Sequence, residues 1–120
     1  MSISNYAENK LLDTIRGTAF SVSAAYLKLH TGDPGEDATA NAATEATRKA
    51  VSFSAASSGS MASSGTVEWT NVSTTETVTH WSLWDASTGG NALWSGALAS
   101  SAALTAGDTF QITSLTITLD

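Results

Sequence analysis

His30 and His80 are the two side chains best suited by type to acid–base or metal chemistry near neutral pH. Each stands in a stretch where apolar and polar residues alternate, and neither has a second histidine or a carboxylate at a ligand-like spacing. A zinc site needs three or four converging donors. We therefore interpret both histidines as ordinary surface or sheet residues, and we predict no metal site.

Sequence motifs for nucleophilic and phosphate chemistry are absent from the chain. Serine and threonine are abundant, but no G-x-S-x-G elbow, P-loop or G-x-G-x-x-G fingerprint occurs. There is no cysteine, which excludes thiolate catalysis and a disulfide framework. A Ser-His-Asp triad assembled only by the fold would leave no such motif and stays an open alternative. The sequence predicts a protein without catalytic residues or cofactors, and not an enzyme.

A cluster of carboxylates, Asp33, Glu36 and Asp37, lies in the segment TGDPGED. A calcium loop would need the pattern D-x-[DN]-x-[DN]-G, which this segment lacks, so we interpret it as a solvated acidic turn. It opens a long segment, residues 32–47, whose second part is predicted as either an extended loop or a short helix. Long loops commonly carry contacts. These carboxylates are expected either to meet Lys or Arg on a partner or only to keep the surface soluble.

The four tryptophans are the remaining candidates, because aromatic faces can stack on sugars. Three of them lie in the stretch VTHWSLWDASTGGNALWSGAL, residues 78–98. Trp81 and Leu83 alternate there with Val78 and Trp84, and two apolar runs flank a small polar loop, which predicts a β-hairpin. Tryptophans on alternating strands are more often core residues than a sugar platform. We expect this hairpin to anchor the core.

Other alternating stretches predict strands at 24–31, 48–54 and 66–69, and a β-rich run covers 109–119. The apolar residues of the last run change parity, which predicts a bulge or bend near Thr113 and Ser114. Short strands with turns between them indicate a mainly β fold, an antiparallel β-sandwich or barrel. The predicted core consists of Leu27, Leu29, Trp69, Trp81, Leu83, Trp94 and Phe110.

One helix is predicted, over residues 5–17. Asn5 can cap its start, Glu8 stands three residues later as in a capping box, and Gly17 suits the position after its end. Its apolar stripe is short and consists of Ala7, Leu11, Leu12 and Ile15. We expect the helix to cover the sheet or a neighbouring subunit.

Length and composition bound the class of protein. A chain of 120 residues predicts one domain, residues 1–120, in which a β body at 20–120 follows the helix. Charged residues make up 13% of the chain, about half the usual share, which fits a surface packed against neighbours. The net charge of −6 argues against direct binding to nucleic acid. No apolar run approaches the ~20 residues that a membrane helix needs, so no membrane partner is predicted.

Several segments of the chain resemble a family of small virion proteins of tailed bacteriophages. They are, in order, YAENKLLD, YLKLHTGDPGEDATANAAT, RKAVSFSAASSGS, the hairpin quoted above and LTAGDTFQI, which together cover nearly the whole chain. The resemblance implies a noncatalytic part of a phage particle, assembled in the cytoplasm of the bacterial host. One departure concerns residues 44–47, where members of the family often have a Gly-Gly-Ser/Tyr stretch.

Two positions in the particle are compatible with this resemblance. We favour a capsid decoration, or cement, protein on the major capsid protein, because a fibre often shows repeats or a coiled coil and this chain has neither. The alternatives are a tail fibre or fibre adaptor that contacts tail proteins, or a glycan-binding β module. A homo-oligomer is expected, with a trimer favoured. The predicted interface residues are Tyr6, Leu11, Leu12, Asp33, Glu36 and Asp37.

Overall fold

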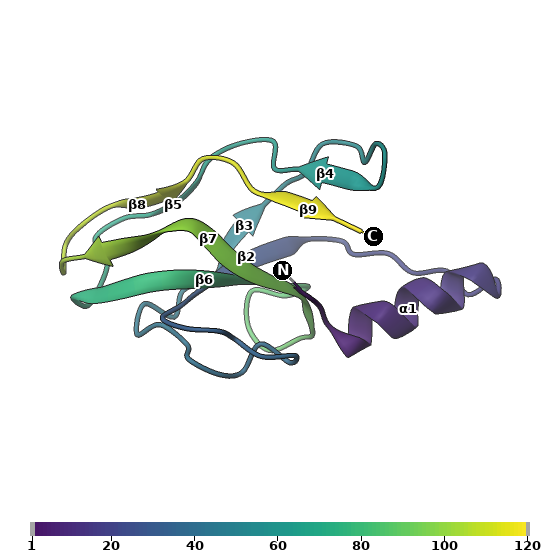
Figure 1. Ribbon diagram of the computed structural model, residues 1–120, viewed down its shortest axis with the longest axis horizontal. Coiled ribbons are helices and arrows are strands. Elements are labelled where there is room, and N and C mark those ends of the chain that lie inside the picture. Colours follow the sequence, from purple (N-terminus) through teal and green to yellow (C-terminus); the bar gives the residue numbers. More distant parts are fainter. Residues whose placement is uncertain (1, 120) are drawn as a thin grey trace.

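The computed structural model describes residues 2–119 and shows a mainly β chain with one N-terminal helix, as predicted (Figure 1). The elements follow in the order β1 (Ser2–Ile3), α1 (Asn5–Ile15), β2 (Ala25–His30), β3 (Lys49–Val51), β4 (Ser60–Ala62), β5 (Val67–Trp69), β6 (Glu76–Trp84), β7 (Ala92–Leu104), β8 (Phe110–Ile112) and β9 (Thr116–Thr118). Within residues 2–119, no helix is both long and apolar enough to span a membrane.

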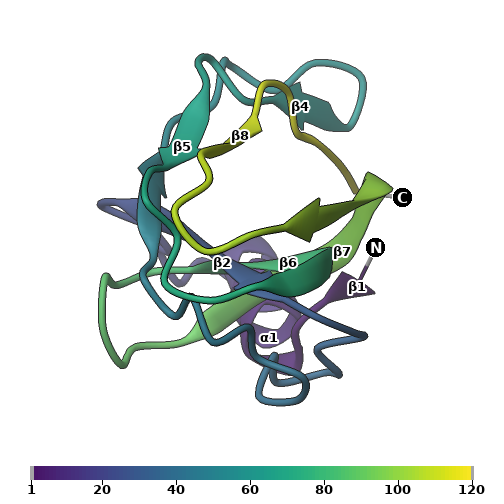
Figure 2. The same ribbon diagram turned by 90° about the vertical axis from the view of Figure 1, so that its left-hand side faces the viewer.

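The strands form three antiparallel sheets and no closed barrel within the described residues. The largest has five strands in the order β1-β7-β6-β2-β3, while β4 pairs with β9 and β5 pairs with β8. Figure 2 shows the two short sheets on one side of the large one, so that the core lies between the layers. The sheets are layered, as in the predicted β-sandwich, and they do not close into the predicted barrel within the described residues.

The hairpin β6–β7 stands at the centre of the large sheet, with β2 on the other side of β6. Leu27 lies opposite Leu83 and Leu29 opposite Trp81, and all four side chains are buried. Trp69 reaches the same core from β5, where its indole Nε1 donates to the carbonyl oxygen of Thr47 at 2.8 Å. The two other predicted core residues, Trp94 and Phe110, are half-buried and pack against this cluster.

A register shift corrects one prediction about β6. Strict alternation puts Val78 on the face opposite Trp81 and Leu83, yet Val78 is buried in the same core cluster. The reason is an irregularity in the pairing with β7, where Val78 faces Ala102 but His80 faces Ala97. Residues 98–101 of β7 are thereby left without partners on β6. The side chains of β6 before and after this bulge therefore follow different parities.

The C-terminal run breaks where its apolar residues change parity, which confirms the predicted bend. β8 pairs with β5 and β9 pairs with β4, so the chain changes partner between Ile112 and Thr116. The break allows Ile112, Leu115 and Ile117 all to be buried in the core.

The N-cap of the helix lies one residue before the predicted one. Ser4, not Asn5, is the N-cap, because its Oγ accepts from the backbone N of Ala7 at 3.1 Å. The Ser4 backbone N also donates to the carbonyl oxygen of Leu93 at 3.0 Å, which ties the cap to β7. At the other end α1 stops at Ile15, two residues before the predicted limit. Gly17 follows at a φ of 95°, where its N donates to the carbonyl oxygen of Thr14 at 3.1 Å.

The long segment after β2 is a loop that covers the second face of the large sheet. It contains no helix, which settles the alternative that the sequence left open. Its backbone returns to β2, since Ala43 N donates to the carbonyl oxygen of Leu29 at 3.1 Å. Pro34, Ala38 and Ala43 are buried, and Ala38 packs with Trp84 on this face.

Candidate assembly interface

A buried serine–histidine pair has the side-chain types of a catalytic nucleophile and its base. His30 Nε2 lies 2.7 Å from Ser82 Oγ, and His30 Nδ1 lies 2.9 Å from the carbonyl oxygen of Ala40. The carbonyl can only accept, so Nδ1 carries the proton and Nε2 accepts from the serine hydroxyl. Ser82 Oγ in turn accepts from Trp84 Nε1 at 2.7 Å.

This pair has the distance of a nucleophile and its base, but it has no access to a substrate. Both His30 and Ser82 have 0% exposure, and every polar atom of the pair is occupied by a structural partner. Burial lowers the pKa of His30 below its ordinary value, because desolvation disfavours the imidazolium. The geometry is that of a satisfied core histidine that holds the loop 31–47 on the sheet.

His80 and the acidic side chains do not assemble a metal site. His80 Nδ1 is 2.7 Å from the hydroxyl of Thr79, its neighbour in the chain. Within residues 2–119, no group of three or more His, Cys, Asp or Glu side chains could hold an ion.

Three of the four tryptophans offer no exposed face to a sugar. Trp69, Trp81 and Trp84 are buried, and Trp94 is half-buried. The ring of Trp84 is covered by the guanidinium of Arg48, whose carbon lies 3.9 Å from the ring centroid. Arg48 also donates to the carbonyl oxygens of Ala86 at 2.8 Å and Gly89 at 2.7 Å, which fixes the hairpin loop over the same region.

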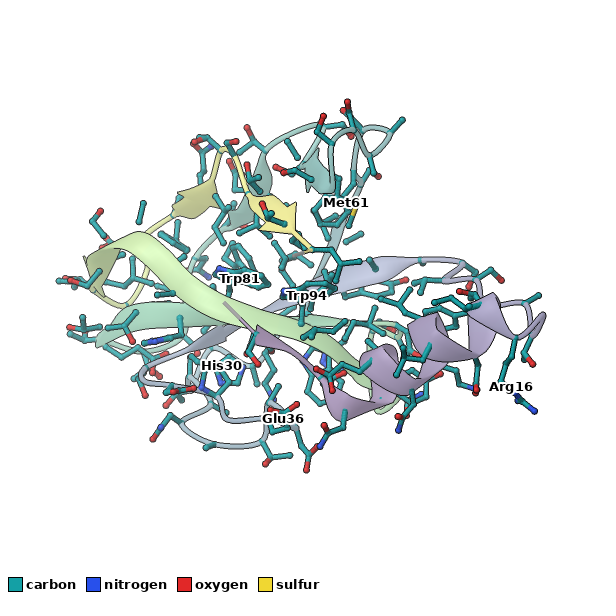
Figure 3. The ribbon with its side chains drawn as sticks, turned by 45° about the vertical axis from the view of Figure 1, so that its right-hand side comes forward. Arg16, His30, Glu36, Met61, Trp81 and Trp94 are labelled. Atoms are coloured by element: carbon teal, nitrogen blue, oxygen red, sulfur yellow. The ribbon has the colours of Figure 1, made fainter. Side chains whose placement is uncertain are left out.

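The predicted interface residues fall on separate parts of the surface. Tyr6 and Asp37 line one small hollow of about 240 Å³ between the helix start and the loop. Asp33 and Glu36 are exposed on that loop, and Figure 3 shows Glu36 far from the tip of the helix, where Arg16 is labelled. Leu11 and Leu12 belong to the second half of α1, Leu11 half-buried and Leu12 exposed.

Part of the acidic segment serves the fold itself. Asp33 Oδ1 accepts from the backbone N of Gly35 at 3.0 Å and closes the turn at Pro34. The carboxylate of Glu76, on β6, accepts from the backbone N of Thr44 and of Glu45, each at 2.9 Å. The carboxylates of Glu36 and Asp37 are exposed, and no ion pair joins the segment to Lys or Arg within residues 2–119.

The most unusual surface lies at the end of the molecule that carries α1. The large exposed apolar side chains among the described residues are Leu12 (64% exposed), Ile15 (84%), Val22 (39%) and Leu119 (53%). Figure 1 shows α1 projecting past the sheet at the end where β4 begins and β9 ends. We call this surface the apolar end, defined by Leu11, Leu12, Ile15 and Leu119.

A hollow of about 320 Å³ lies within the apolar end, between α1 and the short sheet β4–β9. Its walls are Leu11, Met61, Trp94, Ile117 and Leu119, with small residues between 56 and 60 at one side. Met61 also lines a larger hollow that Val22 borders, so the apolar surface continues from the helix past the linker. Figure 3 labels Met61 and Trp94 on the two sides of this region.

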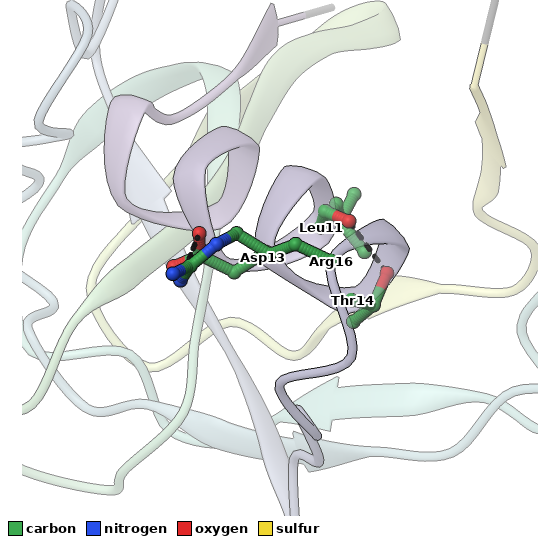
Figure 4. Close-up of polar contacts among 4 residues, drawn as sticks. All are labelled: Leu11, Asp13, Thr14 and Arg16. Atoms are coloured by element: carbon green, nitrogen blue, oxygen red, sulfur yellow. Dashed lines mark hydrogen bonds and ion pairs between the residues drawn. The ribbon is translucent and has the colours of Figure 1, made fainter.

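The polar groups on the free half of α1 are satisfied within the helix itself. Arg16 pairs with Asp13, with 3.5 Å between Nη1 and Oδ1, and Thr14 Oγ1 donates to the carbonyl oxygen of Leu11 at 2.5 Å (Figure 4). The apolar side chains Leu12 and Ile15 of this half are left exposed. The reason is that α1 packs on β7 through its first turns, where Ala7 is buried. The arrangement suits binding to another apolar surface.

Sequence patterns found part of this surface and missed the rest. Helical spacing identified Leu11, Leu12 and Ile15 as one stripe, although only Leu11 and Leu12 were assigned to an interface. Val22 follows the helix in a segment without regular structure, and Leu119 has the parity of the buried Ile117. Nothing in the local pattern distinguishes Leu119 from a core residue, since its exposure depends on where β9 ends.

A comparison with known proteins matches almost the entire chain. The model of a family described as "Podophage GP4 fiber I protein gp80" matches residues 2–120. No curated protein matches the chain.

Proposed function

The chain belongs to the family described as podophage GP4 fiber I protein gp80, and from this membership we propose that it is a tail-fibre component of a tailed phage. The family consists of fibre proteins, so the chain is a structural protein of the virion, as the sequence resemblance implied. This family favours the fibre alternative over the capsid decoration protein that the sequence pattern favours.

The proposed role is noncatalytic and depends on the free energy of its interfaces with tail proteins and with further copies of the chain. The apolar end is the observation that supports this role best. Large contiguous apolar patches are rare on free soluble proteins and commonly mark contact surfaces. Leu12 and Ile15 are exposed on the part of the helix that projects from the body, and the exposed Leu119 borders the apolar hollow beside it.

The buried polar groups of the β body also support a noncatalytic role. Every buried side-chain N or O atom among the described residues has a hydrogen-bond partner, so the interior holds no unsatisfied group waiting for a ligand. The fold therefore serves as a support that places α1 and the adjacent short sheet at one end. Contacts made there join the protein to its neighbours in the virion.

The test uses phage that carry Leu12→Gln and Ile15→Gln together. Glutamine is a good helix former, so α1 should persist while the apolar side chains are lost. We expect the amount of this chain in purified virions, measured by quantitative mass spectrometry, to fall at least severalfold. The isolated variant should still fold and melt cooperatively, because both side chains are largely exposed in the free chain.

The matched control replaces the exposed loop carboxylates with Glu36→Gln and Asp37→Asn. If the apolar end is the interface, this variant is incorporated like the wild type. Normal incorporation of the helix variant would contradict the proposal. Selective loss of the loop variant would move the interface to the acidic segment.

A further inference from the structure

We propose that Lys28 and Arg48 form a binding site for an oxyanion, the carboxylate or phosphate group of a molecule that this protein meets. The site lies beside the ring of Trp84, on the face of the large sheet that the loop 31–47 covers. It does not include the apolar end, so the inference goes beyond the proposed function and does not depend on it.

The strand pairing brings the two cations together on one face of the sheet. Lys28 lies on β2, where alternate residues share a face with Tyr26, the partner of Trp84 on β6. Arg48 directly precedes β3, and the register of β3 with β2, continued by one residue, sets it opposite Lys28. The distance to the centroid of the Trp84 ring is 3.9 Å from Cζ of Arg48 and 5.9 Å from Nζ of Lys28. Two positive charges therefore lie beside one aromatic ring.

Arg48 has free donors that suit two oxygens of one group. Its Nη1 donates to the carbonyl oxygens of Ala86 and Gly89, at 2.8 and 2.7 Å. Within residues 2–119, no acceptor takes the donors on Nε and Nη2. These two nitrogens form the planar fork that binds a carboxylate or a phosphate through parallel hydrogen bonds. Because the hairpin loop holds Nη1, the fork is oriented before a ligand arrives.

The free donors reach the solvent. Among the described residues, every buried side-chain N or O atom has a hydrogen-bond partner. Neither Nζ of Lys28 nor the Nε–Nη2 edge of Arg48 has such a partner there, so these atoms are not buried, although both side chains are half-buried. A ligand in solution can therefore reach them.

The protein itself does not neutralise this pair of charges. Among the described residues, no carboxylate forms an ion pair with Lys28 or Arg48. Asp85 acts on Arg48 from nearby, but its two oxygens already accept from the backbone N and Nδ2 of Asn91. Burial and the charge of Arg48 both lower the pKa of Lys28, which shows that the two cations repel one another. An oxyanion bound between them would relieve this repulsion.

The distribution of charge indicates a single oxyanion and not a polyanion. The chain has 5 Lys and Arg residues against 11 Asp and Glu, so most of its surface repels a row of phosphates. The site offers one fork and one ammonium, which matches one carboxylate or phosphate group. Both groups fit the fork, and the test distinguishes them.

The test is an NMR titration of the full-length protein with sodium phosphate and, separately, with sodium acetate. Sodium chloride keeps the ionic strength constant, so that general screening does not change. We expect saturable shifts of the Arg48 Nε–H signal and of the backbone amides of Lys28 and Arg48 with at least one of the two oxyanions. The oxyanion that binds more tightly identifies the ligand group as a phosphate or a carboxylate. Shifts no larger than those in chloride alone would overturn the proposal.

Lys28→Gln and its matched control Lys49→Gln separate a built site from general attraction. Both variants remove one positive charge, but Lys49 is paired with the buried Leu27 and belongs to the other face of the sheet. We expect Lys28→Gln to weaken oxyanion binding about threefold, as for the loss of one exposed ion pair, and Lys49→Gln to leave it unchanged. Equal weakening by the two variants would overturn the proposal.

Arg48→Lys tests the fork itself, because it keeps the positive charge and removes the planar pair of donors. We expect this variant to lose more affinity than Lys28→Gln. Wild-type affinity in a folded Arg48→Lys protein would contradict binding through the fork. A cooperative melt of each variant shows that it is folded before its affinity is compared.

Discussion

Trp81 sets the distance between the two strands of the central hairpin, because its ring lies directly against the backbone of Gly96. The two residues are paired across β6 and β7. A Cβ atom built on Gly96 would stand 2.7 Å from Cζ2 of Trp81, which is closer than real carbon contacts allow. The buried ring of Trp81 has little room to move, and any added side chain at position 96 must push the strands apart.

Replacing Gly96 by alanine should therefore destabilise the protein although it adds only one methyl group. Overpacking of this kind costs about 1–3 kcal/mol, and we expect the free energy of unfolding to fall within that range. Gly65→Ala is the matched control, because nothing lies within 4 Å of its added Cβ. Chemical denaturation of the two variants checks the prediction. An unfolding free energy for Gly96→Ala within about 0.5 kcal/mol of the control would show that the hairpin can relax around the methyl group.

At the scale of single residues, alternation in the sequence identified the side chains that point into the core but not how deeply each is buried. Leu27, Leu29 and Leu83 follow the pattern and are buried. Trp94 has the same apolar character but is half-buried, because it faces the hollow beside α1. The burial of Trp94 depends on what its neighbours cover, and that is a property of the tertiary structure.

Among the elements, the loop 31–47 is joined to β6 by a hydrogen-bond system centred on His30. His30 joins the carbonyl oxygen of Ala40, in the loop, to the hydroxyl of Ser82, on β6. Protonation of Nε2 would place a second donor against a hydroxyl that now donates to it. Burial, together with the nearby Lys28 and His80, lowers the pKa of His30, so the folded protein keeps this ring neutral.

Acid should therefore weaken the docking of this loop. In the unfolded chain the histidine titrates near its ordinary pKa of about 6.5, whereas in the folded chain its pKa lies lower. Between these two values the unfolded state binds more protons, so the free energy of unfolding falls as the pH is lowered. We expect the melting temperature to drop between about pH 7 and pH 5.5, and His30→Gln to lose most of this dependence.

His80→Gln is the control, because His80 is only half-buried and bonds to its neighbour Thr79. This variant should keep the acid dependence of the wild type. If His80→Gln abolished the slope and His30→Gln retained it, the loop would not be the acid-sensitive element.

The elements differ in how far local sequence determines them. Gly17 marks the end of the helix region because its φ of 95° suits glycine, and the sequence predicted this position. The N-cap is Ser4 and not the predicted Asn5. Ser4 also bonds to β7, and a local sequence pattern does not contain that contact. The bulge opposite Thr79 arises from pairing with β7 in the same way. Local rules locate turns and caps, and pairing partners then adjust them.

At the scale of the whole molecule, charge and apolar surface are separated. The acidic loop covers one face of the large sheet, whereas the exposed Leu12, Ile15 and Leu119 belong to the helix and to the hollow beside it. Sequence composition predicted a surface suited to packing against neighbours, and the helical stripe predicted part of its location. The sequence could not predict that Leu119 lies beside the helix, because the two are far apart along the chain and only the tertiary fold brings Leu119 and Leu11 into one hollow.

Our proposal that this chain is a fibre component of the virion makes a direct prediction for its copy number in purified particles. Quantitative mass spectrometry of purified virions gives the ratio of this chain to the major capsid protein. A fibre component should be present in a handful of copies per particle, at a small fraction of the capsid protein. Hundreds of copies, in a fixed ratio to the capsid lattice, would contradict the account and indicate a capsid decoration protein.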